Sequence, residues 1–225
     1  MKEVFDKIGL NLDENALKKF ELYYNALITF NQKFNITAIT EKTEVYNKHF
    51  ADSLLGLKFI KGGNLIDVGS GGGFPGIPLK ILNPNLKVTL LDATEKKCSF
   101  LREVVKILDF KDVTVICGRA EELGKLSLRE KFDYATARAV GRLNGLLEYT
   151  LPLVKINGSF ICYKGIAEEE VKEAENAIKK LGGIIEKREK FELDYGVREI
   201  IVIKKQSHCP AVYPRAYAKI KKSPL

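Results

Sequence analysis

Short apolar segments alternate with helical segments through the middle of the chain, and this alternation constrains the fold more than any other feature. Five apolar runs have strand character, at residues 65–68, 87–91, 113–117, 132–137 and 159–163. Three segments with helical spacing lie among them, at residues 75–82, 95–108 and 143–151. Strands separated by helices of this length form βαβ units, which build a parallel sheet covered by helices on both faces.

The two ends of the chain extend this α/β unit. Residues 1 to about 60 are predicted to be helical, with an apolar stripe that Asp13 can cap and a second helix around 49–57. After a charged helix over 167–181, strands at 184–193 and 197–203 lie close enough to pair as an antiparallel hairpin. We therefore expect a mostly parallel central sheet with an antiparallel C-terminal hairpin. It would be divided into an N-terminal helical extension (1–60), a main domain (61–205) and a C-terminal tail (206–225).

Almost the whole net positive charge of the chain could come from its last residues, 204–225. Lys and Arg total 37 against 29 Asp and Glu, and the net charge of +8 favours a polyanionic partner, nucleic acid first. From Lys204 to Leu225 there are six Lys and Arg and no acid, with Tyr213 and Tyr217 among them. We expect the tail to bind RNA. The alternative is that it packs back on the sheet with Tyr213 as its anchor.

Several classes of protein are excluded. No run approaches the roughly 18 apolar residues of a membrane span, and the N-terminus has no stretch resembling a signal peptide. The four cysteines are scattered without a Cys-x-x-Cys pair and there are only two histidines, so neither a disulfide framework nor a metal site is expected. The sequence predicts a reduced cytoplasmic protein without a metal.

A glycine-rich loop, DVGSGGGFPG at residues 67–76, follows the first strand and precedes a helix. Read from Gly71, its spacing is the dinucleotide fingerprint of NAD-dependent oxidoreductases. Read from Asp67, it is the Asp-x-Gly-x-Gly-x-Gly loop of S-adenosylmethionine-dependent methyltransferases. An acid at this strand end can hold the methionine moiety, whereas it would oppose a pyrophosphate at the helix N-terminus. A purely structural turn is the third possibility.

Two further acids lie at the ends of the next two strands. Asp92 can accept hydrogen bonds from both ribose hydroxyls, although dinucleotide enzymes use the same device. Glu121 follows the third strand, where methyltransferases read the adenine edge, unless it merely begins a surface helix. Three acids in order at three consecutive strand ends favour the methyl donor over NAD.

The fourth strand constrains the acceptor. It ends at Arg138 without the Cys nucleophile that carbon-5 methylation needs and without the Pro-Pro motif of amine methylation. An acceptor with a lone pair and no proton to lose remains, such as guanine N7, which needs no general base and no covalent intermediate. Arg138 can then orient a base, or it can simply form a salt bridge at the strand end.

The chain resembles the RsmG family, formerly GidB, of bacterial 16S ribosomal RNA guanine-N7 methyltransferases. The resemblance rests on the extended loop with its Pro-Gly-Ile-Pro continuation and on segments in family order at 34–39, 49–54, 91–92, 118–122, 137–139 and 163–165. Tyr213-Pro214-Arg215 also matches, but Ala216-Tyr217-Ala218 stands where the family usually has Lys and a Gly-Thr-Pro turn.

The resemblance implies a Rossmann-like, class I S-adenosylmethionine-dependent methyltransferase that acts on a guanine in the 530 loop of 16S RNA. The small ribosomal subunit or its precursor would present this guanine, and we expect a monomer. Together with the glycine-loop analysis, the resemblance implies donor contacts at Asp67, Gly69, Gly71, Phe74, Asp92, Ala120, Glu121 and Arg138. Arg138 is the residue expected to position the reactants. We expect RNA contacts at Asn35, His49, Lys164, Arg215, Lys219, Lys221 and Lys222.

Two other function classes remain open from the residues alone. One is a methyltransferase of another substrate, and if that substrate is a small molecule or a protein rather than another RNA, its activity would not depend on ribonuclease or salt. A non-catalytic RNA-binding module would bind the donor and transfer no methyl group.

Overall fold

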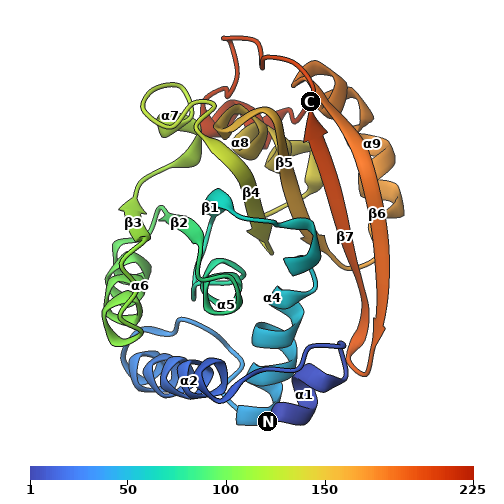
Figure 1. The fold of residues 1–225 in the computed structure, drawn as a ribbon. Helices are drawn as coiled ribbons and strands as arrows, with labels where there is room; N and C mark the ends of the chain where they lie inside the picture. Colours follow the sequence, from blue (N-terminus) through green and yellow to red (C-terminus); the bar gives the residue numbers. More distant parts are fainter.

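The computed structural model describes all 225 residues, and seven strands form one sheet through its centre (Figure 1). The strands are β1 (Gly63–Val68), β2 (Leu86–Asp92), β3 (Val113–Cys117), β4 (Phe132–Arg138), β5 (Val154–Lys164), β6 (Gly183–Leu193) and β7 (Gly196–Lys205). Their order is β3-β2-β1-β4-β5-β7-β6. Strands β1 to β5 are parallel, and β7 is antiparallel to both β5 and β6. The predicted sheet and its C-terminal hairpin are confirmed.

Helices cover both faces of the sheet (Figure 1). One face carries α1 (Lys2–Asp6), α2 (Glu14–Phe34), α3 (Lys42–Val45), α4 (Asp52–Leu54), α5 (Gly76–Leu82) and α6 (Glu95–Ile107). The other carries α7 (Ala120–Leu123), α8 (Leu143–Thr150), α9 (Glu168–Lys180) and α10 (Tyr217–Lys222). Short 3-10 turns lie at Leu57–Phe59 and Leu151–Leu153. No helix combines the length and the apolar character needed to cross a membrane.

The second N-terminal helix differs from the prediction. It begins at Lys42 rather than near residue 49, and α3 continues through a π-helical turn at Tyr46–Ala51 into α4. The Glu41 side chain caps its start by accepting hydrogen bonds from the Thr43 and Glu44 N–H groups at 2.9 and 2.7 Å. Such π-helical turns shift the side-chain register within a helix and are frequent at functional sites.

The sheet separates two apolar cores, and successive residues of a strand lie in different cores because alternate side chains point to opposite faces of a sheet. In β5, Phe160 and Cys162 lie in the core beneath α8 and α9, whereas Ile161 and Tyr163 lie in the core beneath the N-terminal helices. Phe20 of α2 belongs to that same second core. The N-terminal helices and the sheet therefore share one apolar cluster, and the domain boundary at residue 60 stays a prediction.

Helix α2 is tied at both ends and to the glycine-rich loop. Asp13 caps its start as predicted, because its side chain accepts a hydrogen bond from the Ala16 N–H at 2.7 Å. The helix ends where Asn35 adopts a left-handed conformation with φ of 47°. Between these ends, the buried Tyr23 hydroxyl donates to the Gly72 carbonyl oxygen. The N-terminal extension thus fixes one side of the loop.

The C-terminal tail packs against the protein, which is the alternative raised by the sequence. Arg129 donates to the carbonyl oxygens of Cys209 and Tyr213 at 2.5 and 2.8 Å. Arg215 forms a two-pronged ion pair with the fully buried Glu148 of α8, at 2.8 and 2.7 Å. Figure 1 shows the end of the chain beside α8. Arg215 is therefore held within the protein, and the prediction that it contacts RNA does not fit this geometry.

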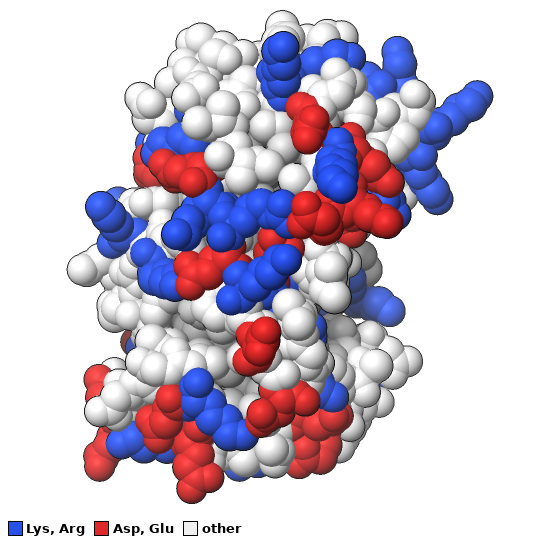
Figure 2. Space-filling model, turned by 90° about the vertical axis from the view of Figure 1, so that its right-hand side faces the viewer, with Lys and Arg blue, Asp and Glu red and all other residues white.

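The surface over β6, β7 and α9 carries both signs of charge. Figure 2 shows blue and red side chains interspersed across this face. Arg188, for example, bonds Glu168 and Glu199, each through a separate guanidinium nitrogen. Charges along the edge strand β6 protect it from pairing with other strands. This face presents no uniform positive field for RNA.

Candidate functional site

The glycine-rich loop between β1 and α5 turns through left-handed backbone conformations. Gly69 and Gly73 have φ angles of 70° and 92°, which residues with a Cβ rarely adopt. The Gly69 N–H donates to the Leu91 carbonyl oxygen at 2.8 Å and so anchors the loop to the end of β2. A Cβ at position 69 would lie 2.7 Å from Val140 Cγ2. Both the conformation and the close approach require glycine there.

A cavity of about 490 Å³ opens beside this loop at the carboxyl ends of β1, β2 and β3. We call it the glycine-loop cavity. In open α/β sheets, ligands bind at this edge where the strand order reverses, which here is between β1 and β4. Four of the residues predicted to bind the donor line the cavity, namely Gly69, Asp92, Ala120 and Glu121. The size suits a nucleoside-bearing ligand.

Asp92 is oriented by the backbone of two neighbouring segments. Its Oδ2 accepts from the Gly71 N–H and its Oδ1 from the Thr94 N–H, both at 2.9 Å. Lys97 lies 3.8 Å from the same carboxylate. These contacts hold the carboxylate at the end of β2, facing the cavity. Gly71 does not line the cavity and contributes by holding Asp92.

Glu121 presents an unsatisfied oxygen. The Glu121 side chain is buried, and its Oε1 has no hydrogen-bond partner in the protein. The nearest cation is the Arg119 guanidinium at 3.7 Å, beyond hydrogen-bond range. A buried acceptor is normally paired, so this oxygen is suited to a donor group on a ligand, such as an exocyclic amine. The residues of the cavity therefore fit an adenosine-bearing ligand.

The tail forms one wall of the same cavity. Tyr217, Ile220, Lys221 and Pro224 all line it. The Arg119 guanidinium lies over the Tyr217 ring, 4.9 Å from its centre, which is the geometry of a cation–π contact. The tail thus lines the cavity as well as presenting basic side chains.

Asp67 has a different position from the one predicted. It is fully buried, and its Oδ1 and Oδ2 accept from the Thr136 hydroxyl at 2.8 Å and the Gly76 N–H at 3.1 Å. Burial raises the pKa of this carboxyl to about 6. Asp67 therefore connects β1 to β4 and to the start of α5. The predicted contact with the methionine moiety does not fit, because the side chain does not reach the cavity.

A second cavity of about 350 Å³ lies at the carboxyl ends of β4 and β5. We call it the Arg138 cavity. Arg138 donates to Asp52 Oδ2 at 2.8 Å and to the Lys48 carbonyl oxygen at 3.0 Å. Asp52, almost fully buried, also accepts from Arg198 Nε at 2.7 Å. Arg138 therefore forms the salt bridge at the strand end, one of the two roles raised by the sequence.

The backbone beside Arg138 is strained, since Ala139 has a φ of 56°. Strain of this kind often accompanies a functional site. Arg138 lines the second cavity and not the glycine-loop cavity, so its predicted contact with the donor does not fit. Phe74 lines neither cavity, and its buried ring lies 5.1 Å from the Arg138 guanidinium, so its predicted contact with the donor does not fit either.

His49 is built into the wall of the Arg138 cavity. Its ring stacks on Phe74 with centroids 4.5 Å apart, and its Nε2 lies 2.8 Å from the Thr37 hydroxyl. Its Nδ1 lies 3.2 Å from a guanidinium nitrogen of Arg138. Burial, followed by the Arg138 charge, lowers the pKa of His49 to about 4. The imidazole is therefore neutral at pH 7.

The other residues predicted to bind RNA are dispersed. Lys164 lines the Arg138 cavity and bonds Glu170 at 2.7 Å. Asn35 is exposed at the end of α2 and lines neither cavity. Lys219 and Lys222 are exposed on α10, and Lys221 is exposed at the rim of the glycine-loop cavity.

Sequence reasoning missed several lining residues. In the glycine-loop cavity these include Asn144 and Tyr149 of α8, and in the Arg138 cavity Asp52 and Arg198. Asp52 lies within the segment 49–54 that carries the family resemblance, so a signal existed for it. Arg198 lies in a charged hairpin where no local pattern distinguishes it from its neighbours.

Comparison with known proteins gives consistent matches. A family model described as rRNA small subunit methyltransferase G (GidB) matches residues 16–199. A protein named ribosomal RNA small subunit methyltransferase G from Thermoanaerobacter sp. is 47% identical over 227 residues, covering 96% of this chain and 93% of its own. The protein of the same name from Acetivibrio thermocellus is 48% identical over 222 residues, covering 96% and 92%.

Solved structures share the fold at low sequence identity. TYW2 from M. jannaschii in complex with AdoMet has a TM-score of 0.54 and 17% identity, covering 68% of this chain and 74% of its own. Precorrin-6y C5,15-methyltransferase from Geobacter metallireducens has a TM-score of 0.54 and 15% identity, covering 69% and 88%. At these identities the likeness concerns the fold.

Proposed function

This chain belongs to the family of rRNA small subunit methyltransferase G, and from that premise we propose that it transfers a methyl group from S-adenosylmethionine to N7 of a guanine in the 530 loop of 16S ribosomal RNA. The reaction is an in-line displacement without a covalent enzyme intermediate. The observation that carries the proposal is the unpartnered, buried Glu121 oxygen in a cavity at the carboxyl edge of the sheet.

The donor occupies the glycine-loop cavity. When bound, S-adenosylmethionine supplies a methyl group that its sulfonium already activates. Asp92 accepts from the ribose hydroxyls, since its carboxylate faces the cavity from the end of β2. Glu121 Oε1 accepts from the adenine amine, beside Ala120, and Gly69 allows the donor to approach the backbone.

The acceptor guanine enters by way of the Arg138 cavity. Four cationic side chains line it, Lys48, Arg138, Lys164 and Arg198, and they suit an RNA strand. The carboxylate that lines this cavity belongs to Asp52; it already accepts hydrogen bonds from Arg138 and Arg198 and is not free to remove a proton. Guanine N7 has no proton to lose and needs no general base, so the pairing of Asp52 agrees with the proposed acceptor. Arg138 positions the base rather than activating it.

Several finer statements follow from the same proposal. The small ribosomal subunit or its precursor presents the guanine, the protein acts as a monomer in the cytoplasm, and residues 61–205 form the methyltransferase domain between the helical extension (1–60) and the tail (206–225). Exposed Lys219 and Lys222, with Lys221 at the cavity rim, bind RNA phosphates near the donor. His49 contacts the RNA from the wall of the Arg138 cavity, and Asn35 contacts it from the exposed end of α2.

The variant Glu121→Gln tests whether the unpartnered Glu121 oxygen binds the donor, because its amide replaces one acceptor oxygen by an NH₂ group that donates. We expect calorimetry to show S-adenosylmethionine affinity weakened by about 1–3 kcal/mol, the usual penalty for an unpaired buried group. The matched control is Glu122→Gln, since Glu122 is exposed one residue later. Equal affinities in the two variants would remove Glu121 from the donor site. Intact binding with no methyl transfer to any ribosomal RNA would instead favour the non-catalytic RNA-binding module.

A further inference from the structure

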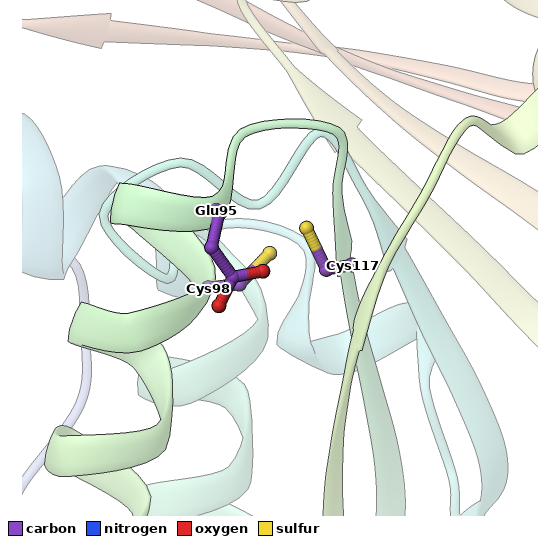
Figure 3. Close-up of side chains that lie close together, drawn as sticks. All are labelled: Glu95, Cys98 and Cys117. Atoms are coloured by element: carbon purple, nitrogen blue, oxygen red, sulfur yellow. The ribbon is translucent and has the colours of Figure 1, made fainter.

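Three side chains outside both cavities bring their potential metal-binding atoms together. A carboxylate oxygen of Glu95 and the sulfurs of Cys98 and Cys117 all lie within 4.8 Å of one another. Figure 3 shows Glu95 and Cys98 projecting from the first turn of α6 toward Cys117 at the end of β3. Glu95 and Cys98 are three residues apart and so share one face of α6. The packing of α6 beside β3 supplies the third ligand.

We propose that Glu95, Cys98 and Cys117 form a zinc site. Two thiolates and a carboxylate are ligands that Zn²⁺ favours, and water would complete a tetrahedron, as in sites with three protein ligands. With zinc–sulfur and zinc–oxygen bonds of about 2.3 and 2.1 Å, tetrahedral ligand atoms lie roughly 3.5–3.8 Å apart. Because all three atoms are already within 4.8 Å of one another, side-chain adjustments of about 1 Å suffice.

The surroundings of the cluster suit such a site. The Cys98 thiol donates to the Asp92 carbonyl oxygen at 3.3 Å and lies 3.9 Å from that of Ile116, and zinc would take the place of the thiol proton. Arg102 donates to one oxygen of Glu95 at 2.6 Å and leaves its other oxygen for the metal. Such outer contacts commonly fix the orientation of metal ligands. Cys117 is exposed, so the ion can enter from solvent.

The charges and protons of the binding step balance. Each thiol releases one proton to solvent and forms one sulfur–zinc bond, and no atom is oxidised or reduced. Two thiolates, one carboxylate and Zn²⁺ leave one net negative charge, which the adjacent Arg102 guanidinium offsets. The site therefore needs no co-reactant.

The bound ion would connect α6 to the edge strand of the sheet immediately behind the donor cavity. Cys117 is the register partner of Asp92 across β2 and β3, and Gly118, the next residue, lines the cavity. Zinc would tie the first turn of α6 to the end of β3 and so stabilise this edge. The role is structural and does not depend on the proposed methyl transfer.

Zinc binding to the full-length protein, freed of metal with a chelator under reducing conditions, tests the proposal. Competition with a chromophoric zinc indicator is expected to show one equivalent bound and a raised melting temperature. Cys117→Ser and Glu95→Gln are expected to weaken binding by more than about tenfold, since loss of even an outer contact typically weakens a site 10–100-fold. Both positions are exposed, so folding, checked by circular dichroism, is expected to persist.

Cys209→Ser is the matched control, because Cys209 is a free thiol in the tail, away from the cluster. Its zinc affinity is expected to equal that of the unmodified protein. Cadmium added in place of zinc is expected to give the ultraviolet absorption of cadmium–thiolate bonds, reduced by Cys117→Ser and retained in Cys209→Ser. The proposal is overturned if no equivalent binds, or if Cys117→Ser binds zinc as tightly as the control does.

Discussion

At the scale of single residues, position 69 is the clearest case in which the structure requires glycine. Its φ is 70°, and an added Cβ would lie 2.7 Å from Val140 Cγ2. We expect Gly69→Ala to weaken S-adenosylmethionine binding and to destabilise the fold by roughly 1–3 kcal/mol, the usual size of such backbone strain. Gly165→Ala is the control, since its Cβ would meet only the Val197 carbonyl oxygen at 4.0 Å. Calorimetry and urea unfolding that rank the two variants equally would contradict this account of the loop.

The sequence identified the cavity residues Asp92 and Glu121 but misplaced Asp67, and the reason is local. All three acids lie at or just after strand ends, where the sequence predicts proximity but not the direction of each side chain. Asp67 is drawn inward by the Thr136 hydroxyl, 69 residues away on β4. A contact at that sequence separation leaves no trace in the spacing of the glycine loop. Arg138 was misplaced for the same reason, because Asp52 and Lys48 hold it in the second cavity.

At the scale of elements, the C-terminal tail is predicted to support donor binding. A variant ending at Lys205 loses Tyr217 and Ile220 from the cavity wall and leaves the buried Glu148 without Arg215. A buried charge that loses its partner typically destabilises a protein by about 3–5 kcal/mol. We therefore expect both the melting temperature and the donor affinity to fall. Unchanged values for both would show that α10 is dispensable to the cavity.

The exposed lysines of α10 are expected to act differently from the rest of the tail. Lys219→Ala with Lys222→Ala removes two exposed charges and no cavity wall. RNA affinity is expected to weaken and its dependence on salt to become shallower, by about 0.7–0.9 in log–log slope for each phosphate that the protein no longer neutralises. Donor affinity should stay constant in calorimetry. An unchanged salt slope would exclude these lysines from the RNA interface.

The elements themselves differ in how far the sequence predicts them. The βαβ alternation and the hairpin were predictable, because each strand and helix carries its own apolar pattern. The break between α3 and α4 was not, since a π-helical turn requires only a local shift within a continuous helical pattern. The packing of the tail could not be decided from the sequence, because it depends on the ion pair between Arg215 and Glu148 of α8. Nothing in the local sequence distinguishes Glu148 from the other charged residues.

At the scale of the whole molecule, stability is expected to depend on pH through His49. The folded pKa of about 4 lies below the ordinary value of 6.5 for the imidazole, so its contribution to stability is complete above pH 6.5 and is lost as the pH falls toward 4. At pH 5 the loss amounts to about 2 kcal/mol. Urea unfolding measures this as the drop in the free energy of unfolding between pH 7.5 and pH 5. We expect this drop to be smaller in His49→Gln than in the unmodified protein by that amount. An identical difference in both proteins would mean that His49 titrates normally in the fold.

Mapping the methylated base tests the central claim most directly. The protein is incubated with radiolabelled S-adenosylmethionine and either naked 16S RNA or small ribosomal subunits, and the RNA is then cleaved chemically at N7-methylguanine. We predict one labelled, cleavable guanine, located in the 530 loop, with the two substrates showing which form is used. Label at another atom or another base, or label in a protein or small molecule that resists ribonuclease, would contradict the account.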